Sequence, residues 1–239
     1  VVIKDIFDLD GASSQETDED GNVADWGSFC SSVDQYIGAL ILNSDITVSN
    51  VLSEGIQGYG WTIIQSNMTL DTAMAQNNTC ASFMAFQGGL QASNVTVANS
   101  NPDYDALGSG MVAYAATLFE VDNSILTGDT SELFDINAYV HESSATFENT
   151  SFNNGGIGIY SYDSSIDATG NTFTGHSNYS LFLSSNTSGS VEHNTTTNTF
   201  IGSDPTGVST GAPVSIYCND SGTINSSGDT FQDVTASYA

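Results

Sequence analysis

An acidic loop near the start of the chain carries the side chains best suited to hold a metal ion. Oxygen-bearing residues recur around Gly21, and they are Glu16, Asp18, Asp20, Asn22 and Asp25. Carboxylate and amide oxygens around a glycine turn are ligands that Ca²⁺ prefers. Glu16 stands where an Asp usually begins such a loop. The spacing predicts a candidate Ca²⁺ site, with a solvated acidic loop as the alternative. No other cofactor is expected.

Carboxylate pairs are the chemistry that glycoside hydrolysis requires. Two pairs lie close together in sequence, Asp103/Asp105 and Glu142/Glu148. Nothing in the sequence places the members of either pair across a cleft. We therefore expect a protein that is not an enzyme, and a carboxylate-dependent glycosidase remains the weakest alternative.

Histidine and cysteine are too sparse to indicate a metal centre. The three histidines lie far apart and lack metal-ligand spacing, and they are His141, His176 and His193. We expect His141 and His193 on the exterior or in turns. The three cysteines allow one disulfide with one thiol left over, and they are Cys30, Cys80 and Cys218. The sequence leaves their pairing open.

The charge of the chain restricts its partners. The 239 residues include 28 acidic residues and one basic residue, Lys4, which gives a net charge of −27. A nucleic-acid partner is excluded, because no cationic surface exists to neutralise phosphates. No apolar run is long enough for a transmembrane helix, so no transmembrane segment is expected.

Nine N-x-[ST] sequons predict N-linked glycans on a secreted chain, and they begin at Asn67, Asn77, Asn94, Asn149, Asn178, Asn186, Asn194, Asn219 and Asn225. Asn, Ser and Thr are also the ordinary turn residues of a β-rich protein, which is the alternative interpretation. The expected location is extracellular or at the cell surface.

A recurring unit organises the chain. A short apolar strand, a polar turn and a second alternating strand repeat eight times, with starts at Ala39, Trp61, Phe83, Val112, Ile136, Ile157, Leu181 and Val214. A unit of this size cannot bury its apolar surface alone, but stacked units form a continuous interior. The pattern predicts a parallel β-solenoid of about eight coils, and an antiparallel β-sandwich is the rival.

Two finer patterns mark turns. Four segments share a pattern that ends in Phe, and they are Asn149–Phe152, Asn171–Phe173, Asn198–Phe200 and Asp229–Phe231. In each, an Asx side chain can hydrogen-bond turn backbone while the Phe enters the core. A second set, expected to stack as a ladder at one turn, comprises Asn50, Asn94, Asn123 and Asn149.

These repeats and turns resemble those of right-handed parallel β-helix proteins, the pectate-lyase-like superfamily, and especially its non-enzymatic surface and adhesin-like members. The resemblance covers about residues 36–233 and implies an all-β, single-stranded right-handed parallel β-helix. Residues 1–35 do not fit the repeat and are expected to be an irregular acidic cap, with the helix over residues 36–239. Pectate-lyase chemistry uses a basic residue, and this chain has no Arg.

Alternation within the first strand of each unit predicts one exterior column of aromatic residues. Its members are Phe86, Tyr114, Tyr139, Tyr160, Phe182 and Tyr217, and extension of the register adds Ile41 and Ile64. An apolar column of this length should be covered by the N-terminal segment, a neighbouring subunit or a carbohydrate.

The sequence favours a secreted, N-glycosylated structural or adhesive solenoid, as a subunit or segment of an extracellular filament or cell-surface layer. Its expected partners are other copies of itself or other extracellular proteins. The alternative is a carbohydrate-binding module that uses the aromatic column.

Overall fold

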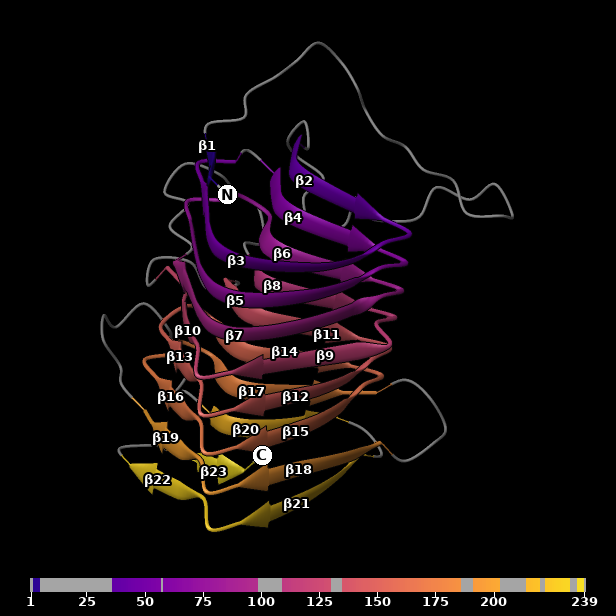
Figure 1. Ribbon diagram of the computed structural model, residues 1–239. Coiled ribbons are helices and arrows are strands. Elements are labelled where there is room, and N and C mark those ends of the chain that lie inside the picture. Colours follow the sequence, from indigo (N-terminus) through magenta and orange to yellow (C-terminus); the bar gives the residue numbers. More distant parts are fainter. Residues whose placement is uncertain are drawn as a thin grey trace.

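The computed structural model describes residues 2–4, 36–56, 58–98, 109–129, 135–185, 191–202, 214–219, 222–232 and 236–238. Within these residues every regular element is a β-strand, and the strands stack in parallel as successive coils of one solenoid (Figure 1). No helix in this part of the chain is long and apolar enough to cross a bilayer.

Nine strands form one wall of the solenoid, which we name sheet 2. They are β2 (Tyr36–Leu42), β4 (Gly58–Ile64), β6 (Ala81–Phe86), β8 (Ser109–Tyr114), β11 (Ile136–His141), β14 (Ile157–Tyr162), β17 (Tyr179–Ser184), β20 (Val214–Asn219) and β23 (Ala236–Tyr238). Each of the eight predicted unit starts falls in one of these strands. The recurring unit of the sequence is therefore one coil.

Fourteen strands form the remaining walls, which we name sheet 1. Its first strands are β1 (Val2–Lys4), β3 (Asp45–Glu54), β5 (Asn67–Gln76) and β7 (Gly89–Ala98). From the next coil onward the long strand is divided in two. The first halves are β9 (Leu118–Asp122), β12 (Ser144–Glu148), β15 (Ser165–Thr169), β18 (Glu192–Thr196) and β21 (Thr223–Ser227). The second halves are β10 (Ile125–Thr127), β13 (Ser151–Asn153), β16 (Thr172–Thr174), β19 (Thr199–Ile201) and β22 (Thr230–Gln232).

The division occurs at a corner where the backbone turns through the left-handed region. The corner residues, one per coil, have φ between +48° and +72°, and they are Asn50, Thr72, Asn94, Asn123, Asn149, Gly170, Thr197 and Gly228. Asn and Gly adopt this conformation at low cost, which explains why the predicted Asn set lies here. The amides of Asn94 and Asn149 bond to carboxylates of the preceding coil. Asn94 donates to Asp71 at 2.9 Å, and Asn149 donates to Asp122 at 3.2 Å.

The interior beside this corner contains a second, buried ladder. Backbone N–H groups donate to a side chain of the next coil: Thr150 to Asn171 at 2.8 Å, Asn171 to Asn198 at 2.9 Å and Asn198 to Asp229 at 2.7 Å. These are the Asx residues of the Phe-ending segments, with Thr150 rather than Asn149 taking the position in the first of them. Each of these three buried backbone N–H groups thus has a side-chain partner.

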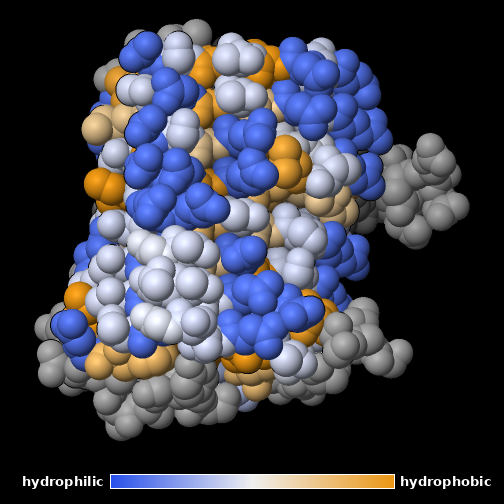
Figure 2. Space-filling view, turned by 60° about the horizontal axis from the view of Figure 1, so that its bottom comes forward, coloured by the Kyte–Doolittle hydropathy of each residue, from blue (hydrophilic) through white to orange (hydrophobic). Residues whose placement is uncertain are grey.

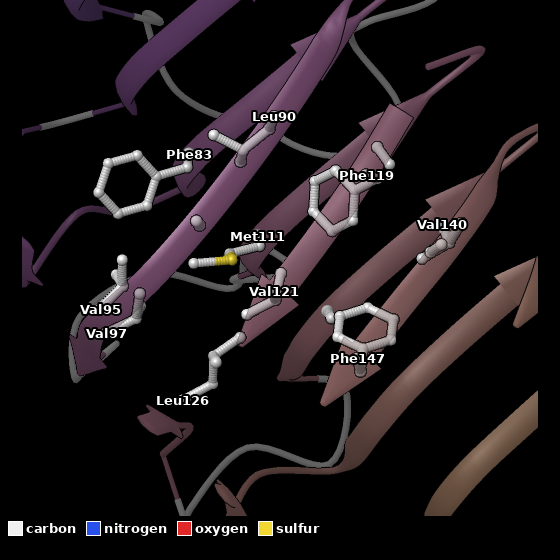
Figure 3. Packing of buried hydrophobic residues seen from close by; sticks show 14 of the residues in the cluster. Phe83, Leu90, Val95, Val97, Met111, Phe119, Val121, Leu126, Val140 and Phe147 are labelled. Carbon is white, nitrogen blue, oxygen red and sulfur yellow. The ribbon is translucent and has the colours of Figure 1, made fainter. Parts of the chain in front are cut away.

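The Phe residues of the same segments stack directly below one another in the core. Ring centroids are 4.8 Å apart for Phe152 and Phe173, 4.9 Å for Phe173 and Phe200, and 5.1 Å for Phe200 and Phe231, with interplanar angles of 5–9°. Figure 3 shows the upper part of this interior, where Phe83, Met111 and Phe119 point into the space between the walls. The core is therefore continuous from coil to coil.

Replacement of Asn198 by alanine should destabilise the solenoid by about 2–3 kcal/mol, since it removes partners from buried backbone groups. Asn198 is fully buried, accepts from the backbone and side chain of Asn171, and donates to the Ala168 carbonyl at 2.9 Å. Urea unfolding followed by circular dichroism measures the loss. The matched control is Asn153→Ala, on the outward face of β13, which should change stability by less than about 0.5 kcal/mol. Equal effects of the two substitutions would contradict the buried ladder.

Candidate functional site

The outer face of sheet 2 gathers the aromatic side chains that the sequence singled out. Along each strand, alternate residues point inward, as Ala138 and Val140 do in β11, where both are fully buried in the main core. The residue between them, Tyr139, belongs to a separate hydrophobic cluster on the opposite face of the same sheet. Strand pleating thus places aromatic rings outside the core.

The aromatic residues form two neighbouring columns rather than one. Column 1 follows the register Tyr139, Tyr160, Phe182 and Tyr217, with Val112 and Met84 preceding it. Column 2 follows the register Ile64, Phe86, Tyr114, His141 and Tyr162. The prediction of a single column was therefore wrong for Phe86 and Tyr114. They lie two residues further along their strands, because β6 and β8 carry Met84 and Val112 at the position that tyrosine takes in β11.

One other expectation about the face was wrong. Ile41 points into the core, where it pairs with the buried Ile63. His141, expected on the exterior or in a turn, does lie on the outer face, where it is a member of column 2. It stacks between Tyr114, at a centroid distance of 4.4 Å and an interplanar angle of 9°, and Tyr162, at 5.0 Å and 7°. Only the register, which places it between two tyrosines, could have identified it.

The rings of both columns lie over one another from coil to coil. In column 1 the centroid distances are 5.2 Å for Tyr139 and Tyr160, 4.9 Å for Tyr160 and Phe182, and 5.1 Å for Phe182 and Tyr217. The interplanar angles are 28°, 41° and 23° in the same order, so the first and third pairs are stacked and the second pair is tilted. The rings of column 1 thus contact one another, and their exposure differs along the column: Tyr139 is 6% exposed, whereas Tyr160, Phe182 and Tyr217 are partly exposed.

Burial on this outer face shifts the pKa of its titratable groups. Desolvation raises the pKa of Tyr139 and of Tyr160, with a smaller contribution from neighbouring tyrosines. Desolvation also lowers the pKa of His141, against the opposite effect of Glu142 and Asp163. At neutral pH the phenols and the imidazole are therefore uncharged.

The face is also without charged side chains in its strands. None of the nine strands of sheet 2 contains Asp, Glu, Lys or Arg. Acidic residues lie elsewhere, for example Asp71, Glu120 and Asp167 on the outward side of sheet 1. On the surface that Figure 2 shows, hydrophilic and intermediate residues predominate, and hydrophobic residues are scattered among them.

The other predicted sites are dispersed. The candidate Ca²⁺ ligands, Asp103/Asp105 and Cys30 lie outside the described residues. Glu142 and Glu148 are both exposed. Glu142 lies in the turn before β12, and Glu148 is the last residue of β12. Cys80 is disulfide-bonded, whereas Cys218 is a thiol. The described residues contain no group of three or more metal-ligating side chains.

The sequons have various positions. Exposed asparagines begin those at Asn67, Asn77, Asn94, Asn149 and Asn225, and partly exposed ones begin those at Asn178 and Asn194. Asn186 and the side chain of Asn219 lie outside the described residues. Six of these seven asparagines lie in sheet 1 or at its corners, away from the strands of sheet 2, and Asn178 directly precedes β17.

Two histidines lie inside the solenoid. The expectation that His193 is exterior was wrong, because it is 2% exposed and occupies an inward position in β18. His176, about which the sequence said little, is also buried and its Nε2 lies 2.8 Å from the side-chain amide of Asn137. Burial lowers the pKa of His176 to about 3 and that of His193 to about 4.

A family model for the right-handed β-helix region matches residues 37–201 of the chain. The match covers most of the described coils and agrees with the handedness that the resemblance implied. No curated protein sequence matches the chain.

His176 should make the protein sensitive to acid. Its pKa rises from about 3 in the folded state to its ordinary value of 6.5 on unfolding, so protonation favours the unfolded state as the pH falls through this window. The free energy of unfolding should fall by about 1.4 kcal/mol per pH unit from this residue alone between pH 6 and pH 4. Urea unfolding at several pH values should show a shallower slope in His176→Gln. Parallel curves for the two proteins would contradict this assignment.

Proposed function

Because the chain belongs to the right-handed β-helix family, we propose that it is an N-glycosylated structural or adhesive rod outside the cell. It acts as a subunit or segment of an extracellular filament or cell-surface layer. The observation that carries the proposal is that the aromatic side chains of sheet 2 contact one another from coil to coil. Rings that stack along the rod axis stiffen successive coils, which is what a structural element requires.

Charge supports self-association through sheet 2. Two copies with a net charge of −27 repel each other over most approaches. The strands of sheet 2 carry no charged residue, so contact through this face brings the fewest carboxylates together. The exposed sequons of sheet 1 and its corners would hold glycans away from the face. A chain with a single Lys and no Arg also offers proteases of trypsin-like specificity almost nothing to cleave, which suits an exposed fibre.

A carbohydrate-binding role is the second candidate, and Tyr179 is the observation in its favour. Its ring meets Phe182 edge-on at 62° and is tilted by 41° against Tyr217, so it is stacked face to face on neither of them. A sugar needs an open ring face to stack upon. Within the described columns most faces are already covered by a neighbouring ring, which makes this role the weaker of the two.

Sedimentation velocity and electron microscopy of the secreted protein test the proposal at 0.15 M and 1 M salt. We expect elongated assemblies that grow with salt, since salt screens the repulsion between like-charged copies. The double variant Tyr160→Ala/Phe182→Ala should assemble at least tenfold less at equal concentration. Its matched control is Thr172→Ala/Thr199→Ala on the outward face of sheet 1. Compact monomers at both salt concentrations would overturn the filament role, and sugar binding lost in the aromatic variant alone would favour the second candidate.

Masses before and after glycan removal test the glycosylation. The sequon at Asn149 is best removed by Ser151→Ala, and that at Asn94 by Thr96→Ala, because both changes leave the left-handed asparagine in place. Each should lower the mass by one glycan. An unchanged mass on deglycosylation of the wild-type protein would exclude this part of the proposal.

A further inference from the structure

Two pairs of tyrosines on the outer face of sheet 2 are in ring contact across neighbouring coils. The first pair is Tyr139 and Tyr160, and the second is Tyr179 of β17 and Tyr217 of β20. The ring centroids are 5.2 Å apart in each pair. Neighbouring phenols have a chemistry that a single phenol lacks, because one-electron oxidation converts each to a phenoxyl radical and two such radicals couple. Coupling requires that both phenols of a pair can be oxidised.

Exposure distinguishes the two pairs. Tyr179 and Tyr217 are both partly exposed, whereas Tyr139 is 6% exposed. Desolvation also raises the pKa of the Tyr139 phenol, which opposes loss of the proton that leaves on oxidation. An oxidant in solvent therefore reaches both phenols of the second pair but only one phenol of the first.

Strand pairing holds the second pair in place. β17 and β20 run in parallel with Phe182 opposite Tyr217. The Phe182 ring lies between those of Tyr160 and Tyr217, with centroid distances of 4.9 and 5.1 Å, and it has no hydroxyl group to oxidise. Among the described residues, Tyr179 is the phenol in ring contact with Tyr217. Reactants that a rigid backbone holds side by side react much faster than the same groups free in solution.

We propose that Tyr179 and Tyr217 form a site of oxidative modification, at which hydrogen peroxide and a peroxidase join the two rings as dityrosine within one chain. Each phenol gives up one electron and its hydroxyl proton, and the two radicals form one carbon–carbon bond between ring positions next to the oxygens. The hydrogens at those two carbons move to the oxygens and restore both phenols. The two electrons and two protons reduce one peroxide molecule to two water molecules.

The product links two coils covalently and has lost two hydrogen atoms. Because the link forms within one chain, it does not depend on the assembly proposed above. It would oppose separation of β17 from β20, near the C-terminal end of the described coils.

Treatment of the dilute full chain with hydrogen peroxide and a haem peroxidase tests this site, with the blue fluorescence of dityrosine as the signal. We expect a product that still runs as a single chain on a denaturing gel. Its peptic digest should contain two peptides joined through Tyr179 and Tyr217. The substitutions Tyr179→Phe and Tyr217→Phe should each lower the fluorescence at least tenfold. Tyr179→Phe keeps the sequon at Asn178, so a glycan there is common to both proteins.

The matched controls are Tyr160→Phe and Tyr162→Phe, which remove partly exposed phenols from columns 1 and 2. Both should give the fluorescence of the wild-type protein, and circular dichroism verifies that each variant is folded. Undiminished fluorescence in Tyr179→Phe or Tyr217→Phe would overturn the proposal. Cross-links found only between chains, or no dityrosine in the wild-type protein, would overturn it as well.

Discussion

The register between successive coils is the constraint on which every other feature depends. Each strand hydrogen-bonds to the equivalent strands above and below, so a residue is buried or exposed according to its column. A slip of one residue would exchange the two faces of a strand. Core phenylalanines would then meet solvent, and outer tyrosines would enter the interior.

Two devices hold this register in place. The left-handed corner residue fixes where sheet 1 bends, and it recurs once per coil from Asn50 to Gly228. The buried Asx ladder then joins the backbone of one corner to a side chain of the next, as Asn171 and Asn198 do. Both devices act at corners, where strand pairing alone would leave backbone groups unsatisfied.

Much of the architecture was predictable because it follows from repetition. The eight unit starts and the Phe-ending segments mark the same place in every coil, and the family match agrees with the right-handed form. The prediction of a single aromatic column was correct for Tyr139, Tyr160, Phe182 and Tyr217 and wrong for Phe86 and Tyr114. The sequence of β6 and β8 offers an aromatic residue two positions away from the tyrosine of β11, and only strand pairing can decide between the two positions. The pairing joins Tyr114 to His141 instead of Tyr139.

Buried polar residues were the least predictable part of the molecule. The sequence predicts His193 to be a turn or exterior residue, because histidine in a polar stretch normally lies in solvent. Its inward position depends on pairing with Ile224, which lies 31 residues further along the chain.

Distances between spin labels on one outward column test the stacking most directly. Thr47, Thr69, Gln91, Glu120, Thr146, Asp167, Asn194 and Asn225 follow one another in register. With one label at Thr47 in a Cys218→Ser background, a second label at Glu120, Asp167 or Asn225 should lie about 14, 24 and 34 Å away, because neighbouring coils are about 4.8 Å apart. Distances that increase in this order support the stack. Distances that do not increase with coil number, as two antiparallel sheets would give, contradict it.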